Sequence, residues 1–185
     1  WILAGHDGIL AVDIGGTNIR AGVVELNRRK AENLSAARVS GLELWRHRDD
    51  APDRDDAVDQ LAGMLRTLAR RAKKDGLRLA PLIGIGCPGL IRDDGSIVKG
   101  GQNLPGGDWE MDGFNLPRRI RELVPDIGGH ETAVLMHNDA VVQGLSEVPC
   151  MRDVERWGVL TIGTGLGNAR FTNRTGVSGG GGRDD

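Results

Sequence analysis

An acid, two adjacent glycines and a threonine lie between two apolar runs in residues 9–24, ILAVDIGGTNIRAGVV. A two-residue hairpin turn needs positive φ angles but has no use for the acid. Glycines expose backbone N–H groups without a Cβ in the way, which lets a polyphosphate approach the main chain. Asp13 adds a carboxylate and Thr17 a hydroxyl donor at the same place. The stretch therefore predicts a phosphate site, with a plain structural turn as the alternative.

A second loop of the same kind, GTGLG at residues 163–167, follows a later apolar run. The chain contains no Gly-Lys-Ser/Thr and hence no Walker loop, and the strand-like segment after residue 167 disfavours a dinucleotide fingerprint. The strand–turn–strand pattern of residues 9–24 recurs at 157–172, which suggests two related lobes. Two such loops can clamp the phosphates of a nucleotide, with Asp13 helping to hold magnesium.

Three further motifs occur between these loops. They are GCPG at residues 86–89, GQNLPGGDW at 101–109 and HNDA at 137–140. Together with the two loops, and in this order, they resemble the ROK family of sugar kinases and the related bacterial glucokinases, within the actin-like ATPase superfamily. The resemblance covers roughly residues 9–172. The loop at 101–109 departs from the family's pattern by the extra Gly107-Asp108 before Trp109.

The resemblance implies a role for each motif residue. The residues implied to hold ATP are Asp13, Gly15, Gly16, Thr17, Asn18, Gly163, Thr164, Gly165 and Gly167, and Asp13 would also bind Mg²⁺. The residues implied to contact the sugar are Pro88, Gly89, Asn103, Asn138 and Asp139. By position alone, Asp139 is a good helix N-cap. Its place beside Asn138 in the motif set instead implies the general base that accepts a proton from the sugar's primary hydroxyl.

The elements that position these motifs follow from hydrophobic periodicity. Strands are expected at 9–14, 19–26, 41–46, 82–86, 132–136, 157–162 and 169–172, with a hairpin turn at 93–96. Helices are expected between Asp53 and Gly76, at 115–124 and at 139–148, the last with Ala140, Val141, Leu145 and Val148 facing inward. This order gives a mixed α/β chain, and the resemblance implies a ribonuclease H-like lobe of the actin-like ATPase type, with a mixed sheet flanked by helices.

Two lobes are expected along the chain. Residues 1–150 would form the N-terminal sugar- and phosphate-binding lobe, and residues 154–185 the start of a second, nucleotide-binding lobe that is only partly present. We expect the chain to be part of a two-lobe protein, because the strand pair at 157–172 has little of its own to bury against. The alternative is a truncated remnant.

Composition narrows the possible partners. The 185 residues carry a net charge of −2 with acids and bases intermixed, so neither nucleic acid nor a membrane is expected as a partner. The two cysteines, Cys87 and Cys150, form no metal-spaced cluster and fit a reducing, cytoplasmic setting. His6, His47 and His130 fit no catalytic or metal-binding pattern. The resemblance leaves a homodimer open.

The expected function is ATP-dependent phosphorylation of a hexose, glucose or a related sugar, at its primary hydroxyl. A glucokinase-like enzyme of this kind works by positioning the reactants and stabilising charge on the phosphoryl group. The resemblance leaves a second function open, since the family includes non-catalytic, sugar-sensing regulators. A plain structural fragment is a third possibility, but it leaves the order of the motifs unexplained.

Overall fold

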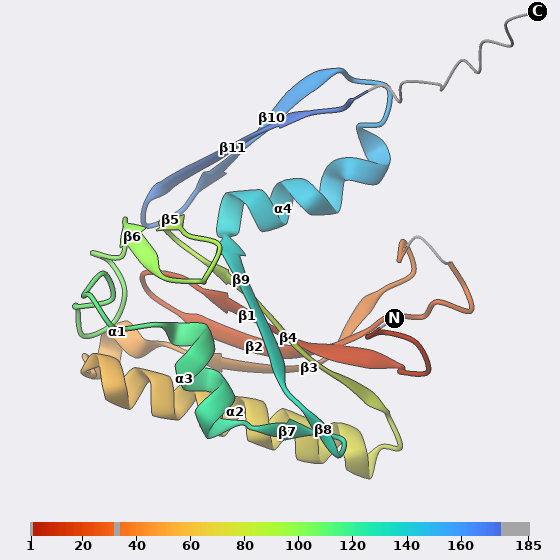
Figure 1. Ribbon diagram of the computed structural model, residues 1–185, viewed down its shortest axis with the longest axis horizontal. Coiled ribbons are helices and arrows are strands. Elements are labelled where there is room, and N and C mark those ends of the chain that lie inside the picture. The colour runs from red at the N-terminus through yellow and green to blue at the C-terminus, as the bar shows by residue number, and fades with distance from the viewer. Residues whose placement is uncertain (1, 32–33, 175–185) are drawn as a thin grey trace, which may run out of the picture.

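A five-stranded mixed sheet of order β3-β2-β1-β4-β9 forms the centre of the computed structural model, which describes residues 2–31 and 34–174 (Figure 1). Its strands are β1 (Gly8–Ile14), β2 (Ile19–Glu25), β3 (Arg38–Trp45), β4 (Leu79–Cys87) and β9 (Ala133–Asn138). β1, β2 and β3 are antiparallel neighbours, whereas β4 and β9 run parallel to β1. The carboxyl ends of β1, β4 and β9 therefore meet at one edge of the sheet, where α/β proteins commonly bind ligands.

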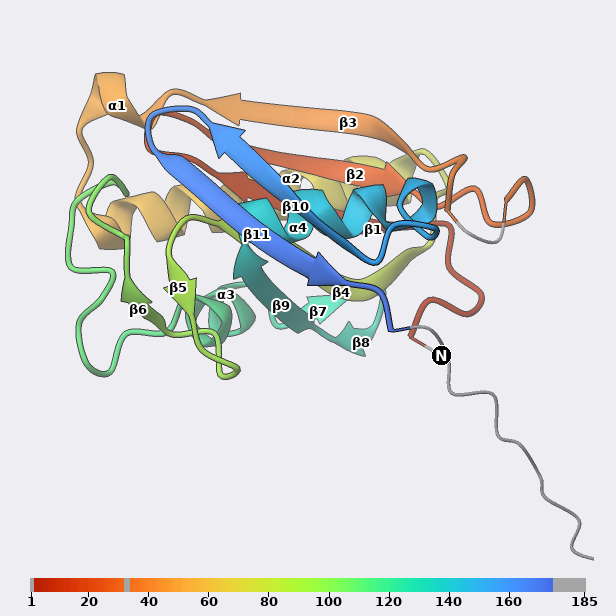
Figure 2. The same cartoon turned by 90° about the horizontal axis from the view of Figure 1, so that it is seen from above.

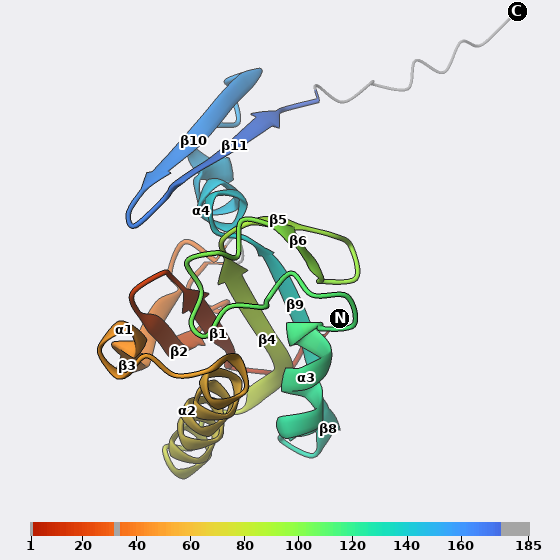
Figure 3. The ribbon, with the colours of Figure 1, turned by 90° about the vertical axis from the view of Figure 1, so that its left-hand side faces the viewer.

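One face of the sheet is covered by α2 (Arg54–Lys74) and α3 (Leu116–Leu123), as Figures 1 and 3 show. The Asp53 side chain caps α2 by accepting a hydrogen bond from the Asp56 N–H at 2.8 Å. The residues that α2 buries are Ala57, Val58, Leu61, Ala62, Met64, Leu65, Leu68 and Ala72. The periodicity that predicted this helix is thus confirmed, since its apolar stripe is the face that packs on the core.

Several short elements connect the larger ones. They are α1 (His47–Asp50), the hairpin of β5 (Leu90–Ile91) and β6 (Ile97–Lys99), the hairpin of β7 (Asp126–Ile127) and β8 (His130–Glu131), and the 3₁₀ turn η1 (Val148–Cys150). The turn predicted at 93–96 lies between β5 and β6 and is confirmed. The sequence did not indicate α1 or the β7–β8 hairpin, because such short elements show no measurable periodicity.

On the other side of the sheet, α4 (Asp139–Glu147) supports a separate hairpin of β10 (Arg156–Ile162) and β11 (Leu166–Thr172), seen from above in Figure 2. Phe171 lies so close to Gly144 that any Cβ there would overlap its ring, and Trp157 stacks on Phe171 at 4.3 Å between ring centroids. This packing turns Ala140 and Gly144 inward. The prediction that Leu145 faces inward is wrong, since that side chain is 56% exposed.

The loop between β10 and β11 is shorter than predicted. β11 begins at Leu166, so Leu166 and Gly167 belong to the strand and residues 163–165 alone form the turn. Residues 175–185, the end of the expected second lobe, lie outside the described residues, and the division into two lobes stays a prediction. Within the ranges that the structure describes, no helix is both long and apolar enough to cross a membrane.

Candidate functional site

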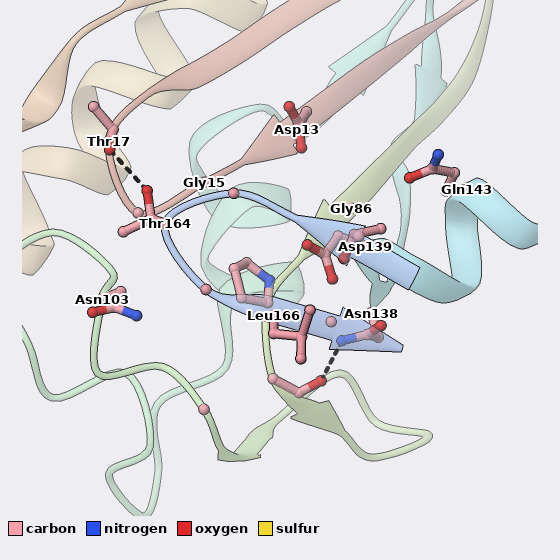
Figure 4. Close-up of a pocket in the computed structure, with 18 of the residues that line it drawn as sticks. Asp13, Gly15, Thr17, Gly86, Asn103, Asn138, Asp139, Gln143, Thr164 and Leu166 are labelled. Carbon is pink, nitrogen blue, oxygen red and sulfur yellow. Dashed lines mark hydrogen bonds between the residues drawn. The ribbon is translucent and has the colours of Figure 1, made fainter. Parts of the chain in front are cut away.

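A cleft of about 960 Å³ opens where β1 and β4 end, between the central sheet, α4 and the β10–β11 hairpin (Figure 4). Every residue that the sequence assigned to a site lines this one cleft. These residues are Asp13, Gly15, Gly16, Thr17, Asn18, Pro88, Gly89, Asn103, Asn138, Asp139, Gly163, Thr164, Gly165 and Gly167. Segments spread over most of the chain thus meet at a single place, although which ligand each residue contacts stays a prediction.

The two Gly/Thr loops contact each other across the cleft. The hydroxyls of Thr17 and Thr164 lie 3.0 Å apart and share a hydrogen bond, although 147 residues separate them in the sequence (Figure 4). A Cβ on Gly16 would lie 3.0 Å from the Asn103 Cβ and 3.1 Å from the Thr164 Cγ2. These distances are shorter than ordinary packing, so any larger residue at this position would require its neighbours to shift.

Two carboxylates face the cleft from neighbouring elements. Asp13, at the end of β1, accepts a hydrogen bond from Arg20 of β2 at 2.8 Å. Asp139 begins α4. Burial raises the pKa of the Cys87 thiol at the end of β4, and the negative charges of Asp139 and Asp13 raise it further. Cys87 is therefore a neutral core residue, and both carboxylates act on the same region at the end of the sheet.

The donor set at Asp13 fits magnesium held mainly by water and phosphate. Mg²⁺ in nucleotide sites is commonly bound by one or two carboxylates, substrate phosphates and several waters. Among the described residues, no group of three or more histidine, cysteine or acidic side chains could form an all-protein metal cage. The half-exposed carboxylate of Asp13, which also pairs with Arg20, could supply one such ligand, and its role at a magnesium ion stays a prediction.

Asn138, at the junction between β9 and α4, is the N-cap of α4. Its Oδ1 accepts hydrogen bonds from the N–H groups of Ala140 at 3.0 Å and Val141 at 3.4 Å. The interpretation of Asp139 as the N-cap is wrong, because Asp139 is the first residue of α4. Nδ2 of Asn138 donates to the Gly89 carbonyl at 2.9 Å (Figure 4). Among the described residues, no second hydrogen bond from this amide nitrogen is formed.

Gly89, in the connection between β4 and β5, packs closely against the last residue of β6, Lys99. Gly89 has φ +108°, and a Cβ there would lie 2.6 Å from the Lys99 carbonyl oxygen. Since this φ lies in the region that favours glycine, both the conformation and the space require this residue. The Gly89 carbonyl, held by Asn138, ties this wall of the cleft to the start of α4.

Asn103 lies on a loop that buried aromatic packing fixes in place. Trp109 is 2% exposed, donates from Nε1 to the Pro105 carbonyl at 2.6 Å and meets Phe114 edge-on at 5.5 Å. The extra Gly107-Asp108 is accommodated by three successive positive φ angles, +75°, +72° and +59°, at residues 106–108. Residues 106–108, which include the two extra residues, therefore form a turn with left-handed backbone angles. Asn103 still lines the cleft.

Two adjacent glycines on this loop give a matched stability test. Gly106 and Gly107 both have positive φ, but a Cβ on Gly106 would overlap the backbone of Asp53 and Arg54, whereas one on Gly107 meets nothing within 4 Å. We expect Gly107→Ala to lower the free energy of unfolding by about 1 kcal/mol through the strained φ alone. Gly106→Ala should cost about 3 kcal/mol or more because the overlap adds to that strain. Urea denaturation followed by tryptophan fluorescence measures both, and equal losses would contradict the packing described for Gly106.

Sequence reasoning missed several polar residues of the cleft, including Arg20, Gln102, Gln143 and Asn168. Two of them, Arg20 and Gln143, could have been predicted from their spacing to a carboxylate in the sequence. Arg20 lies opposite Asp13 once the β1–β2 hairpin is closed by the pair Ile14–Ile19. Gln143 follows Asp139 by four residues, which places both on one face of a helix. No comparable signal marks Gln102, on the loop at 101–109, or Asn168, on β11, because their place in the cleft depends on how these segments pack.

The sheet order and the paired glycine-rich hairpins at its edge define the class of the protein as an actin-like ATPase lobe of the ribonuclease H type. The chain belongs to the ROK family, whose family model matches residues 9–184. The resemblance and the fold class expected from the sequence are thereby confirmed. No curated protein sequence matches the chain.

Solved structures with the same fold include enzymes and a regulator. The Lmo2764 protein of Listeria monocytogenes, a candidate N-acetylmannosamine kinase, is 27% identical with a TM-score of 0.60, over 90% of this chain and 47% of that one. A Streptomyces griseus ROK glucokinase in complex with glucose and AMPPNP is 22% identical, with a TM-score of 0.64, over 90% and 45%. A ROK transcriptional regulator homologous to the E. coli MLC protein is 18% identical, with a TM-score of 0.65, over 90% and 37%. The chain therefore spans less than half the length of these three structures.

Proposed function

We propose that this protein phosphorylates a hexose, either glucose or a related sugar. ATP is the donor, and the sugar's primary hydroxyl is the acceptor. One observation carries the proposal: both Gly/Thr loops, the Asn103 loop and Asp139 line a single cleft. The Streptomyces griseus glucokinase, which has the same fold and binds glucose and AMPPNP, supports this choice of ligands. N-acetylmannosamine, suggested by the name of the Listeria relative, is the competing sugar.

Asp139 is the group that would accept the proton. Its carboxylate lies at the start of a helix whose N-cap is Asn138, and its Oδ1 accepts a hydrogen bond from the Ala140 N–H at 2.8 Å, which helps to fix its position. A carboxylate fixed at hydrogen-bond distance from a hydroxyl can take its proton as the oxygen attacks the γ-phosphate. The bond from the attacking oxygen to phosphorus forms while the bond to the leaving ADP oxygen breaks. The rigid junction between β9 and α4 holds the base in place for this step.

The two Gly/Thr loops would hold the phosphates through main-chain N–H groups and the hydroxyls of Thr17 and Thr164. These hydroxyls contact each other directly, so a phosphate oxygen placed between them would replace that single hydrogen bond with two. Asp13 would hold Mg²⁺ through water, and the ion would neutralise negative charge on the β- and γ-phosphates. Phosphoryl transfer depends mainly on such positioning and charge stabilisation.

Turnover of glucose with ATP by the full-length protein tests the function, measured as ADP release. A sugar-sensing regulator is the second candidate, favoured by the similarity in fold to the MLC homologue. Calorimetric sugar binding without turnover would support the regulator, and the absence of both would contradict both functions. N-acetylmannosamine and mannose, tested alongside glucose, identify the sugar.

Asn103→Ala separates sugar contacts from nucleotide contacts. Asn103 lines the cleft from an anchored loop, so truncating it removes hydrogen bonds to a ligand and leaves the loop's aromatic anchor untouched. We expect the KM of the sugar to rise about tenfold or more and the KM of ATP to change by less than about twofold. Asp108→Asn, at an exposed residue of the same loop that does not line the cleft, is the control. Equal effects on both substrates, or none, would remove Asn103 from the sugar site.

A further inference from the structure

His47 is one of two buried polar or charged residues in the described part of the chain, at 3% exposed; the other is Thr132, at 2%. It begins α1, and one residue separates it from the end of β3 at Trp45. Its Nε2 lies 2.8 Å from the carbonyl oxygen of Gly15, in the first Gly/Thr loop. A carbonyl oxygen only accepts hydrogen bonds, so Nε2 carries the proton and donates it. The edge of Trp45, at 5.9 Å between ring centroids, packs against the imidazole.

The bond from His47 determines where the next N–H group points. The Gly15 carbonyl and the Gly16 N–H belong to one peptide unit, which is planar and trans, so they point in opposite directions. His47 lies behind the loop, whereas Gly15 and Gly16 line the cleft. Holding the Gly15 carbonyl toward His47 therefore turns the Gly16 N–H away from α1 and toward the cleft.

Two further carbonyls of this loop also accept hydrogen bonds from the protein. The Thr17 carbonyl accepts from the N–H of Arg48 in α1 at 3.4 Å, and the Asn18 carbonyl accepts from the Gly15 N–H at 2.8 Å. Carbonyl oxygens repel an anion, whereas N–H groups attract it. Since the loop contains glycines, its peptides could otherwise rotate easily and present oxygens to the cleft.

We propose that His47 is a positioning residue of the first phosphate loop, and that its hydrogen bond to the Gly15 carbonyl keeps the Gly16 N–H directed at the nucleotide phosphates. This inference rests on the proposed binding of ATP at this cleft, and it deepens that proposal by assigning a role to a residue outside the cleft lining. His47 touches no substrate. It acts through the peptide between Gly15 and Gly16.

Two substitutions of His47 separate this role from simple packing. His47→Leu fills similar space without a donor, and His47→Gln keeps an N–H donor near the position of Nε2. In the full-length protein we expect His47→Leu to weaken binding of a fluorescent ATP analogue by about tenfold and His47→Gln to restore most of it. The KM of the sugar should stay within about twofold in both variants, because their effect is confined to the phosphate loop. Thr132→Val, which alters the other buried polar residue, is the control and should leave both values unchanged.

A spectroscopic measurement tests the same bond without activity. In ¹⁵N-resolved NMR spectra of the wild type, His47 should show a proton on Nε2, and the Gly16 amide signal should move in His47→Leu but return toward its original position in His47→Gln. A proton on Nδ1 alone, an unmoved Gly16 signal, or unchanged ATP affinity in folded His47→Leu would overturn the inference. If the wild type binds no ATP but the Gly16 signal responds as expected, the nucleotide proposal fails while the positioning of the loop by His47 stands. The wild-type proton assignment remains decisive should His47→Leu fail to fold.

Discussion

Asp139→Asn is expected to lower kcat by roughly two to four orders of magnitude in the full-length protein. The amide keeps the shape of the carboxylate and can still hydrogen-bond a sugar hydroxyl, but it cannot accept its proton. The KM of the sugar should therefore change little. Thermal stability should also change little, because Asn138 caps α4 and an amide oxygen can still accept the hydrogen bond that Asp139 Oδ1 receives from the Ala140 N–H at 2.8 Å. Steady-state kinetics and a thermal melt on the same preparation measure all three quantities.

The control for this substitution is Asp59→Asn, which removes an exposed carboxylate from α2, outside the cleft. It should leave kcat at the wild-type value. If Asp139→Asn turned over near the wild-type rate, another group would have to accept the proton, and the kinase proposal would lose its general base. If the melting temperature fell together with kcat, the loss of activity would reflect damage to the start of α4.

Gly16→Val is expected to raise the dissociation constant of ATP by roughly a hundredfold or more while the far-ultraviolet circular dichroism stays nearly unchanged. A Cβ at this position already meets Asn103 and Thr164 at 3.0 and 3.1 Å, and the two methyl groups of valine need further space. The neighbours that must move belong to cleft loops, not to the core, so the fold should survive. Titration with a fluorescent ATP analogue gives the affinity.

Gly16→Ala should have an intermediate effect, since its single methyl group requires a shift of only a few tenths of an ångström. Gly63→Val is the matched control, because a Cβ on Gly63 of α2 meets nothing within 4 Å and valine is a better helix former than glycine, so helix propensity gives no reason for a loss of stability. Loss of the folded spectrum in Gly16→Val alone would support the alternative of a structural turn in residues 9–24. Retained affinity would remove this loop from the phosphate site.

The sequence by itself determined the parts of this protein that depend on local patterns. The periodicity from Val58 to Ala72 identified α2 because an amphipathic stripe is repeated within one element. Alternating apolar runs located most of the sheet, with β3 beginning at Arg38, earlier than expected, since an exposed edge strand needs no apolar residues on its outer positions. The ordered motifs indicated the family, which the family model then confirmed.

Only the tertiary structure decided which distant groups meet. The contact between Thr17 and Thr164 and the inward face of α4 both depend on packing between separate elements. No local pattern records such packing. His47 is the plainest case, because a lone histidine in the sequence carries no pattern at all. Its function is defined by a single carbonyl 32 residues away, which the fold of β3 and α1 brings within hydrogen-bonding distance.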